Sequence, residues 1–239
     1  MRKEVLAIGC VLLMLCGCGN NSAAQHYESG WAALEKKDYS TAEQEFQQVI
    51  DLDSRLAESY RAEGIAYYSE GAYPEAIAAF SRSLNNMDDP DKEFKKDVQF
   101  YLAQARMDYG EVDKAIEVYS EILKAGEDTQ AFFLRGKAYI SMDDYENAGK
   151  DFQRALKGCE DYNLYINIYQ IYVDNNKAVD GDAYLKMALE LEPQDGEDYY
   201  HRGRIYEYEK NYEAARDELK TSMEQGYEDA MLLLGRVYP

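Results

Sequence analysis

The pattern of apolar and polar positions is clearest in the segment 63–80, which reads EGIAYYSEGAYPEAIAAF. Runs rich in helix formers stand on either side of the turn residues 72–74, which predicts two helices joined by a tight turn. Gly64 lies inside the first helix, where a glycine costs about 1 kcal/mol relative to alanine. We therefore expect a second helix to pack closely against Gly64, and the same glycine to recur wherever that packing recurs.

The glycine does recur, with a period of 33–34 residues over most of the chain. It is found at four positions, Gly30, Gly64, Gly136 and Gly203, while Ala103 and Tyr169 stand at the equivalent place in two further units. Twelve residues later each unit has a small residue, in order Ala42, Ala76, Ala115, Ala148, Gly181 and Ala215. Four residues after that comes a large apolar residue: Phe46, Phe80, Tyr119, Phe152, Leu185 and Leu219. A repeat of this length with two helical stretches per unit predicts a helical solenoid.

These residues resemble the tetratricopeptide repeat pattern, most completely in Tyr60, Gly64, Tyr67, Ala76 and Phe80. The resemblance implies an all-α fold: a right-handed α-solenoid of about six helix-turn-helix repeats with a C-terminal capping helix. The expected repeats, within 23–238, are 23–56, 57–90, 96–128, 129–161, 162–195 and 196–227, followed by a cap at 228–238. In such an array each unit buries its apolar face only by stacking on its neighbours, so the recurring aromatic residues are expected in the core.

Two segments depart from the regular spacing. The polar loop 85–92, NNMDDPDK, holds an insertion of five residues, and we expect it to be the boundary or hinge between two parts of the array. The last segment, 224–238, is also similar to the first helix of Sel1-like repeats, and Leu232, Leu233 and Leu234 are expected to seal the end of the core.

The first residues form a separate element. Arg2 and Lys3 precede an eleven-residue apolar run, which is too short to span a bilayer comfortably and is typical of a secretory signal. The following LCGCG, residues 15–19, resembles the lipobox of bacterial lipoproteins. That resemblance implies a signal peptide at 1–17, a diacylglycerol on Cys18, and a short tether over 18–22 that leaves the chain exported and membrane-anchored. An uncleaved hydrophobic anchor without lipid is the alternative.

The net charge limits the kinds of partner, and the number of cysteines limits the possible disulfides. The chain has 46 acidic and 26 basic residues, a formal charge of −20, which disfavours nucleic acid and anionic headgroups and favours basic or neutral partners. After removal of the signal and lipidation of Cys18, Cys159 is the one thiol left in the body, so no disulfide framework is expected.

Catalytic groupings are not evident. The two histidines, His26 and His201, are too few for a histidine-based metal site, and the chain has no phosphate-binding glycine loop, nucleophile elbow or calcium loop. We therefore expect no enzyme activity, no cofactor and no metal.

The resemblance implies instead that a ligand binds in the concave groove lined by the first helix of each repeat. Carried over repeat by repeat, the groove residues are Tyr27, Trp31, Arg61, Phe100, Gln104, Phe133, Lys137, Ile166, Gln170, Tyr200 and Arg204. Aromatic residues beside cations and amides suit an extended or helical peptide. The alternative is that several of them are buried by packing between repeats.

Two functions follow from this set. The first is a lipoprotein scaffold or assembly factor of the cell envelope that binds a protein or peptide partner in the groove. The second is an envelope binding protein for a small molecule or glycan, with the aromatic residues stacked on sugar rings.

Overall fold

The computed structural model describes residues 21–87 and 91–237, so the expected signal peptide and Cys18 lie outside the described residues. The described part consists of thirteen α-helices without a β-strand, which confirms the all-α prediction. In chain order the helices are α1 (Asn21–Glu35), α2 (Tyr39–Asp51), α3 (Leu56–Glu70), α4 (Tyr73–Asn85), α5 (Lys92–Tyr109), α6 (Val112–Ala125), α7 (Thr129–Ser141), α8 (Tyr145–Ala155), α9 (Tyr162–Asp174), α10 (Ala178–Leu189), α11 (Gly196–Tyr208), α12 (Tyr212–Glu224) and α13 (Asp229–Val237).

The chain divides into two compact units, residues 1–105 and 106–239. The division falls between Ala105 and Arg106, inside α5, so the expectation that the 85–92 segment marks the boundary is wrong. Part of the insertion lengthens α5, which has 18 residues, where α3 and α7 have 15 and 13. The extra residues add about one helical turn, since a turn takes about 3.6 residues.

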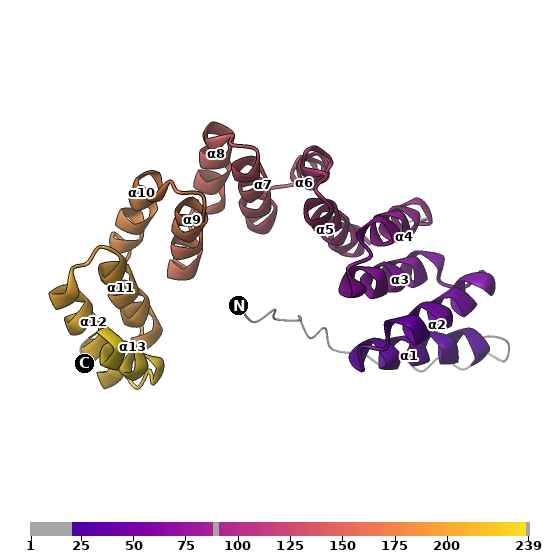
Figure 1. Cartoon of the computed structure of the whole chain (residues 1–239), viewed down its shortest axis with the longest axis horizontal. Helices are drawn as coiled ribbons and strands as arrows, with labels where there is room; N and C mark the ends of the chain where they lie inside the picture. The colour runs from indigo at the N-terminus through magenta and orange to yellow at the C-terminus, as the bar shows by residue number, and fades with distance from the viewer. Residues whose placement is uncertain (1–20, 88–90, 238–239) are drawn as a thin grey trace. The chain divides into compact units, whose positions relative to one another are not determined.

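Within each unit, consecutive helices pack as hairpins: α1 with α2 and α3 with α4 in the first, and α7 with α8, α9 with α10 and α11 with α12 in the second (Figure 1). Each turn from a first to a second helix has one residue with a left-handed backbone. These residues are Lys37, Gly71, Gly110, Asp143, Asn176 and Lys210, with φ between 59° and 92°. The turn geometry therefore keeps the same register as the glycine repeat.

Polar side chains cap several of the second helices. Asp38, Asp144 and Asn211 each accept a hydrogen bond from the backbone N–H three residues on, at 3.2, 3.1 and 3.4 Å. Such caps satisfy a backbone donor that has no partner inside the helix. None of the described helices combines the length and the apolar character that crossing a membrane requires.

The recurring glycines make room for a ring from the same repeat. A Cβ atom on Gly30, Gly64 or Gly136 would lie 2.6, 2.6 or 2.7 Å from a ring carbon of Phe46, Phe80 or Phe152. At Gly203 the atom met is Leu219 Cδ2, at 2.8 Å. Close packing is thus the reason for the glycine, and the partner is the large side chain sixteen residues later as well as the facing helix.

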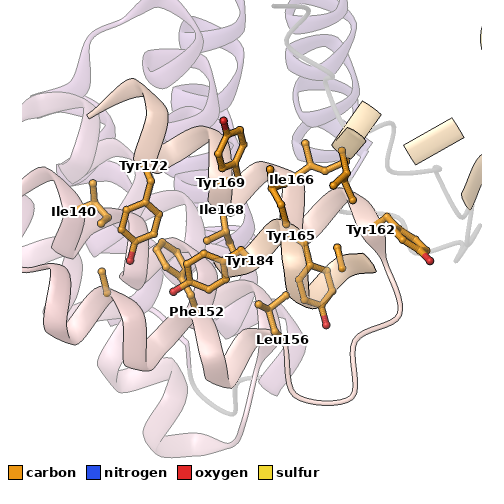
Figure 2. Packing of buried hydrophobic residues seen from close by; sticks show 14 residues of the cluster. Ile140, Phe152, Leu156, Tyr162, Tyr165, Ile166, Ile168, Tyr169, Tyr172 and Tyr184 are labelled. Carbon is orange, nitrogen blue, oxygen red and sulfur yellow. The ribbon is translucent and has the colours of Figure 1, made fainter. Parts of the chain in front are cut away.

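The main core of the second unit is built from aromatic residues. Phe152, which is fully buried, lies with its ring centroid 6.1 Å from those of Tyr172 and Tyr184, and these two tyrosines stack at 5.6 Å. Figure 2 shows these rings beside one another, with Ile140, Ile168 and Leu156 close to them. Burial raises the pKa of the Tyr184 hydroxyl. Tyr172 and Tyr184 come from the hairpin that follows Phe152, so each hairpin completes the core of the one before it.

Two partly buried ion pairs recur at equivalent places. Arg135 on α7 donates from Nε and Nη2 to the carboxylate oxygens of Asp151 on α8, at 2.7 and 2.8 Å. Two repeats later, Arg202 on α11 donates to Glu218 on α12 at 3.1 Å. In each pair the arginine directly precedes the packing glycine and the acid lies sixteen residues on. The fourth and sixth repeats therefore each neutralise a half-buried arginine with an acid of the same repeat.

Candidate partner-binding surface

In the first unit, two of the expected groove residues serve as packing residues. Tyr27 and Trp31 on α1 lie edge-on to each other and to the buried Phe46, with ring centroids 5.8–6.2 Å apart. The guanidinium of Arg55 lies 4.3 Å from the centroid of the Tyr27 ring, a cation–π contact. Both aromatic side chains are half-buried, so each presents only part of its ring to a ligand.

The side chain of Arg61 on α3 is bound by residues of a neighbouring helix, α5. Its Nε donates to Oδ2 of Asp97 on α5 at 2.5 Å, and its guanidinium lies 5.4 Å from the ring centroid of Tyr101. The side chain is 13% exposed, so it joins α3 to α5. Phe100 and Gln104, also expected in the groove, are half-buried on α5.

In the second unit, the expected residues divide between core and surface. Ile166 is 2% exposed and belongs to the core cluster, so its assignment to the groove is wrong. Phe133 is half-buried, with its ring 6.1 Å from that of Phe152. Lys137 is exposed, and the Gln170 amide donates to Asp174 on its own helix at 2.9 Å. The physical reason for the error is that α9 is buried on more than one face, with Tyr162, Tyr165, Ile166, Ile168, Tyr169 and Tyr172 all in the interior.

Tyr200 and Arg204 line a hollow of about 870 Å³ on the second unit, which we call the C-terminal pocket. It is formed by α11, the following turn, the start of α12, and α13. Its lining residues are Tyr200, Arg204, Glu207, Tyr208, Lys210, Tyr212, Asp229, Leu232 and Leu233. The lining combines three phenol rings and two leucines with two basic and two acidic side chains. Such a mixture of apolar area and a few polar groups is typical of a ligand site.

Neighbouring side chains fix the position of the pocket's aromatic and basic groups. The ring of Tyr200 packs against that of Tyr227 at 5.2 Å, and the Arg204 guanidinium lies 5.8 Å from the Tyr200 ring centroid. Arg204 Nη1 is also 3.3 Å from Nδ1 of His201, while the Asn163 amide nitrogen is 2.9 Å from Nε2 of the same ring.

His201 is 5% exposed, and its pKa lies below the usual value, first because of burial and then because of Arg204. The opposing effects of Glu197 and Asp161, which raise the pKa, are smaller than these two together. The ring is therefore neutral at neutral pH and adds no charge beside Arg204.

The helix α13 packs with one face and exposes the other. Ala230 and Leu233 are buried against Leu219, whereas Met231 and Leu232 are 60% and 76% exposed. The expectation that Leu232 seals the core is therefore wrong, because successive residues on a helix point about 100° apart and only one face meets α11 and α12. Leu232 therefore remains exposed while it lines the C-terminal pocket.

Sequence reasoning missed several residues of this pocket. Tyr208 continues the line of Tyr200 and Arg204 at a spacing of four residues, so it extends the same face of α11 by one turn. The predicted set took at most two residues from each first helix. The same four-residue spacing would also have predicted Tyr208. Lys210 comes from the turn, Tyr212 from the start of α12 and Leu232 from α13, and their positions depend on tertiary packing.

Helix hairpins that repeat in register, each glycine facing the large residue of its own hairpin, define a helical-repeat protein. A model of the tetratricopeptide repeat matches residues 27–91 and 100–163, and a second such model matches residues 199–224. The chain belongs to the tetratricopeptide repeat family. The matched segments stop before α13.

Solved structures show the same fold at low sequence identity. A tetratricopeptide repeat protein from Parabacteroides merdae aligns with a TM-score of 0.53 and 18% identity, over 91% of this chain and 99% of its own. The MamA protein aligns at 0.59 and 18%, over 81% and 97%, and MamA from Desulfovibrio magneticus at 0.59 and 16%, over 72% and 95%. No curated protein matches the sequence. These similarities concern the fold alone, which does not by itself establish a function.

Proposed function

We propose that the protein is a membrane-anchored lipoprotein scaffold of a bacterial cell envelope, and that its C-terminal pocket binds a protein partner. The observation that carries the binding proposal is the hollow lined by Tyr200, Arg204 and the exposed Leu232. Aromatic and arginine side chains are the commonest anchors of protein interfaces, and a leucine at the rim extends the apolar area. The mixed charges at the rim suit a peptide with an apolar side chain between polar neighbours.

The pocket also favours a second candidate, a glycan or small molecule. Its volume of about 870 Å³ falls within the range of small-ligand sites, and Tyr200, Tyr208 and Tyr212 offer faces for sugar rings. No enzymatic role is proposed. Among residues 21–87 and 91–237, His, Cys, Asp and Glu side chains nowhere gather in a group of three that suits a metal ion.

Capture of a partner from a detergent extract tests the scaffold proposal. A variant with Arg204→Ala and Leu232→Ala is expected to retain at least tenfold less of a defined partner, because it removes a charged and an apolar contact while leaving the buried Leu233 in place. The measurement is quantitative mass spectrometry of proteins held by the tagged full chain. The matched control is Val179→Ala with Lys186→Ala, which makes the same chemical changes on the exposed side of α10.

Equal capture by the pocket variant and the control would contradict the proposed site. Binding of oligosaccharides that is lost in the pocket variant, without any captured protein, would favour the second candidate.

The membrane anchor is proposed from the residues 15–19, LCGCG, in which Cys18 follows two small residues. Labelling of cells with a radioactive fatty acid is expected to mark the wild-type chain and the Cys16→Ala variant, but not Cys18→Ala. Two or three acyl chains hold a protein firmly at a membrane, so the Cys18→Ala protein should also leave the membrane fraction. Label that persists in Cys18→Ala would remove the anchor from the proposal.

A further inference from the structure

The second repeat lacks the internal arginine–acid pair that Arg135 and Arg202 form in the fourth and sixth repeats. We compare two positions in each repeat: the one directly before the packing glycine, or before Ala103 or Tyr169 in its place, and the one sixteen residues later. In repeat order these pairs are Ser29 and Glu45, Glu63 and Ala79, Leu102 and Val118, Arg135 and Asp151, Ile168 and Tyr184, and Arg202 and Glu218. Two of these pairs are apolar and two are ion pairs. In the second repeat the acid Glu63 has an alanine, Ala79, at the position of its partner.

Glu63 is buried without a partner for one of its oxygens. It is 4% exposed, and its Oε2 has no hydrogen-bond partner. Its pKa is raised to about 7, chiefly by burial; the charge of Arg82 on α4 lowers it, and Glu43 raises it by a smaller amount. An unpaired carboxylate in the interior is costly, and interiors normally supply a cation or several N–H donors to it.

The side chain of Glu63 lines an open hollow of about 500 Å³ on the first unit, between the adjacent helices α2 and α3. Figure 1 shows these helices side by side at the indigo end of the chain. The remaining lining residues are Glu43, Gln44, Glu45, Gln47, Gln48 and Tyr67. The lining thus has three carboxylates, three amides and one phenol, and no basic side chain.

Two of these acids have no ion-pair partner among the described residues, although the charge of Arg82 acts on Glu63. Glu45 Oε2 lies 2.7 Å from Nδ1 of His26, whereas neither Glu43 nor Glu63 forms an ion pair with a described residue. The pKa of Glu43 is raised by burial and by Glu70 and Glu75. The Tyr67 hydroxyl, with a pKa raised to about 12 by burial and by Glu63, stays neutral. The hollow therefore has negative charge, oxygen acceptors and one aromatic face, which together match a cation.

We propose that this hollow binds the ammonium group of an organic amine, with Glu63 Oε2 as the acceptor at its inner end and Glu43 as the second negative charge. An ammonium fits better than a metal ion, because the described residues here and elsewhere do not form a cluster of three metal-ligating side chains. It supplies three N–H donors, which the buried oxygen and the glutamine carbonyls accept. The cation that the fourth and sixth repeats carry as an arginine comes, in the second repeat, from a ligand. This proposal is independent of the C-terminal pocket.

Calorimetric titration of the full chain in detergent with spermidine tests the proposal at physiological ionic strength. Wild-type protein is expected to bind one spermidine saturably, and Glu63→Gln is expected to weaken binding at least tenfold. Glu63→Gln keeps the shape of the side chain and removes a buried charge, so it should fold; a thermal unfolding curve checks this. The matched control is Glu117→Gln, an exposed acid on α6 in the other unit, which should change the affinity less than twofold.

The pH dependence supplies a second readout. Between pH 6 and 8, spermidine binding to the wild type should strengthen as Glu63 loses its proton, and this strengthening should be absent in Glu63→Gln. The charged groups that shift the Glu63 pKa are Arg82 from α4 and Glu43 from α2. Tyr67 stays neutral over this pH range. Equal weakening in Glu63→Gln and Glu117→Gln would overturn the proposal.

A further titration separates the two sources of the ammonium group. N-acetyl-lysine amide stands for a lysine of a protein partner, and spermidine for a free amine. Tighter binding of the lysine compound assigns the site to a protein lysine, and tighter binding of spermidine assigns it to a free polyamine. Failure of both compounds to bind would overturn the proposal.

Discussion

Replacing Phe152 with alanine is expected to lower the free energy of unfolding by about 3–5 kcal/mol, the range for a fully buried phenylalanine. The ring is 0% exposed and contacts Phe133, Tyr172 and Tyr184. Its loss removes apolar burial and leaves a cavity between two hairpins. Urea denaturation of the full chain, followed by circular dichroism, measures the change.

The matched control is Tyr109→Ala, which truncates an aromatic residue that is 52% exposed and should cost less than about 1 kcal/mol. Because the ring joins consecutive hairpins, hydrogen exchange should also accelerate in α9 and α10 of the Phe152→Ala protein. A loss similar to that of Tyr109→Ala would contradict the role of Phe152 as a shared core residue.

Replacing Gly136 with alanine is expected to cost about 2–3 kcal/mol, although alanine is the better helix former. The added Cβ would lie 2.7 and 2.9 Å from two carbons of the Phe152 ring, closer than real contacts allow. Tyr172 and Tyr184 pack against that ring, so it has little room to move and the substitution overpacks the core.

Gly149→Ala, in the partner helix of the same hairpin, is the matched control. Its Cβ would meet only the Tyr184 hydroxyl at 3.9 Å, an ordinary contact, so the gain in helix propensity should raise stability by about 0.5–1 kcal/mol. Thermal unfolding of the two variants should shift in opposite directions. A shift of the same sign and size in both would show that Gly136 is not there for packing.

The sequence predicts the fold well because its determinants are local and periodic. The glycine and the large residue sixteen positions later stand in one hairpin, so their contact follows from helix geometry and a short turn. The same holds for the turn residues with positive φ, which keep the period.

The binding surface is predicted only in part, because exposure depends on packing between units of the repeat. Ile166 occupies a groove position by register but lies in the core, since α9 is apolar on several faces. Arg61 is held by Asp97, which comes from a helix after the irregular insertion. Tyr200 and Arg204 line a pocket as expected from their positions, but Leu232 joins them only through the tertiary placement of α13.

Glu63 illustrates a different limit of prediction from sequence. Its place before the packing glycine is visible in the sequence, and so is the alanine that replaces its partner. Its burial and the orphaned oxygen become evident only in the structure, since a glutamate at this position is otherwise indistinguishable from a solvated one.

The central functional claim is that a partner binds at the C-terminal pocket, and site-specific photocrosslinking in living cells tests it most directly. A photoreactive phenylalanine analogue placed at position 208, inside the pocket, is expected to yield a discrete crosslinked partner. The same analogue at position 109, exposed and outside the pocket lining, should yield none. A partner crosslinked from position 109 and not from position 208 would contradict the claim.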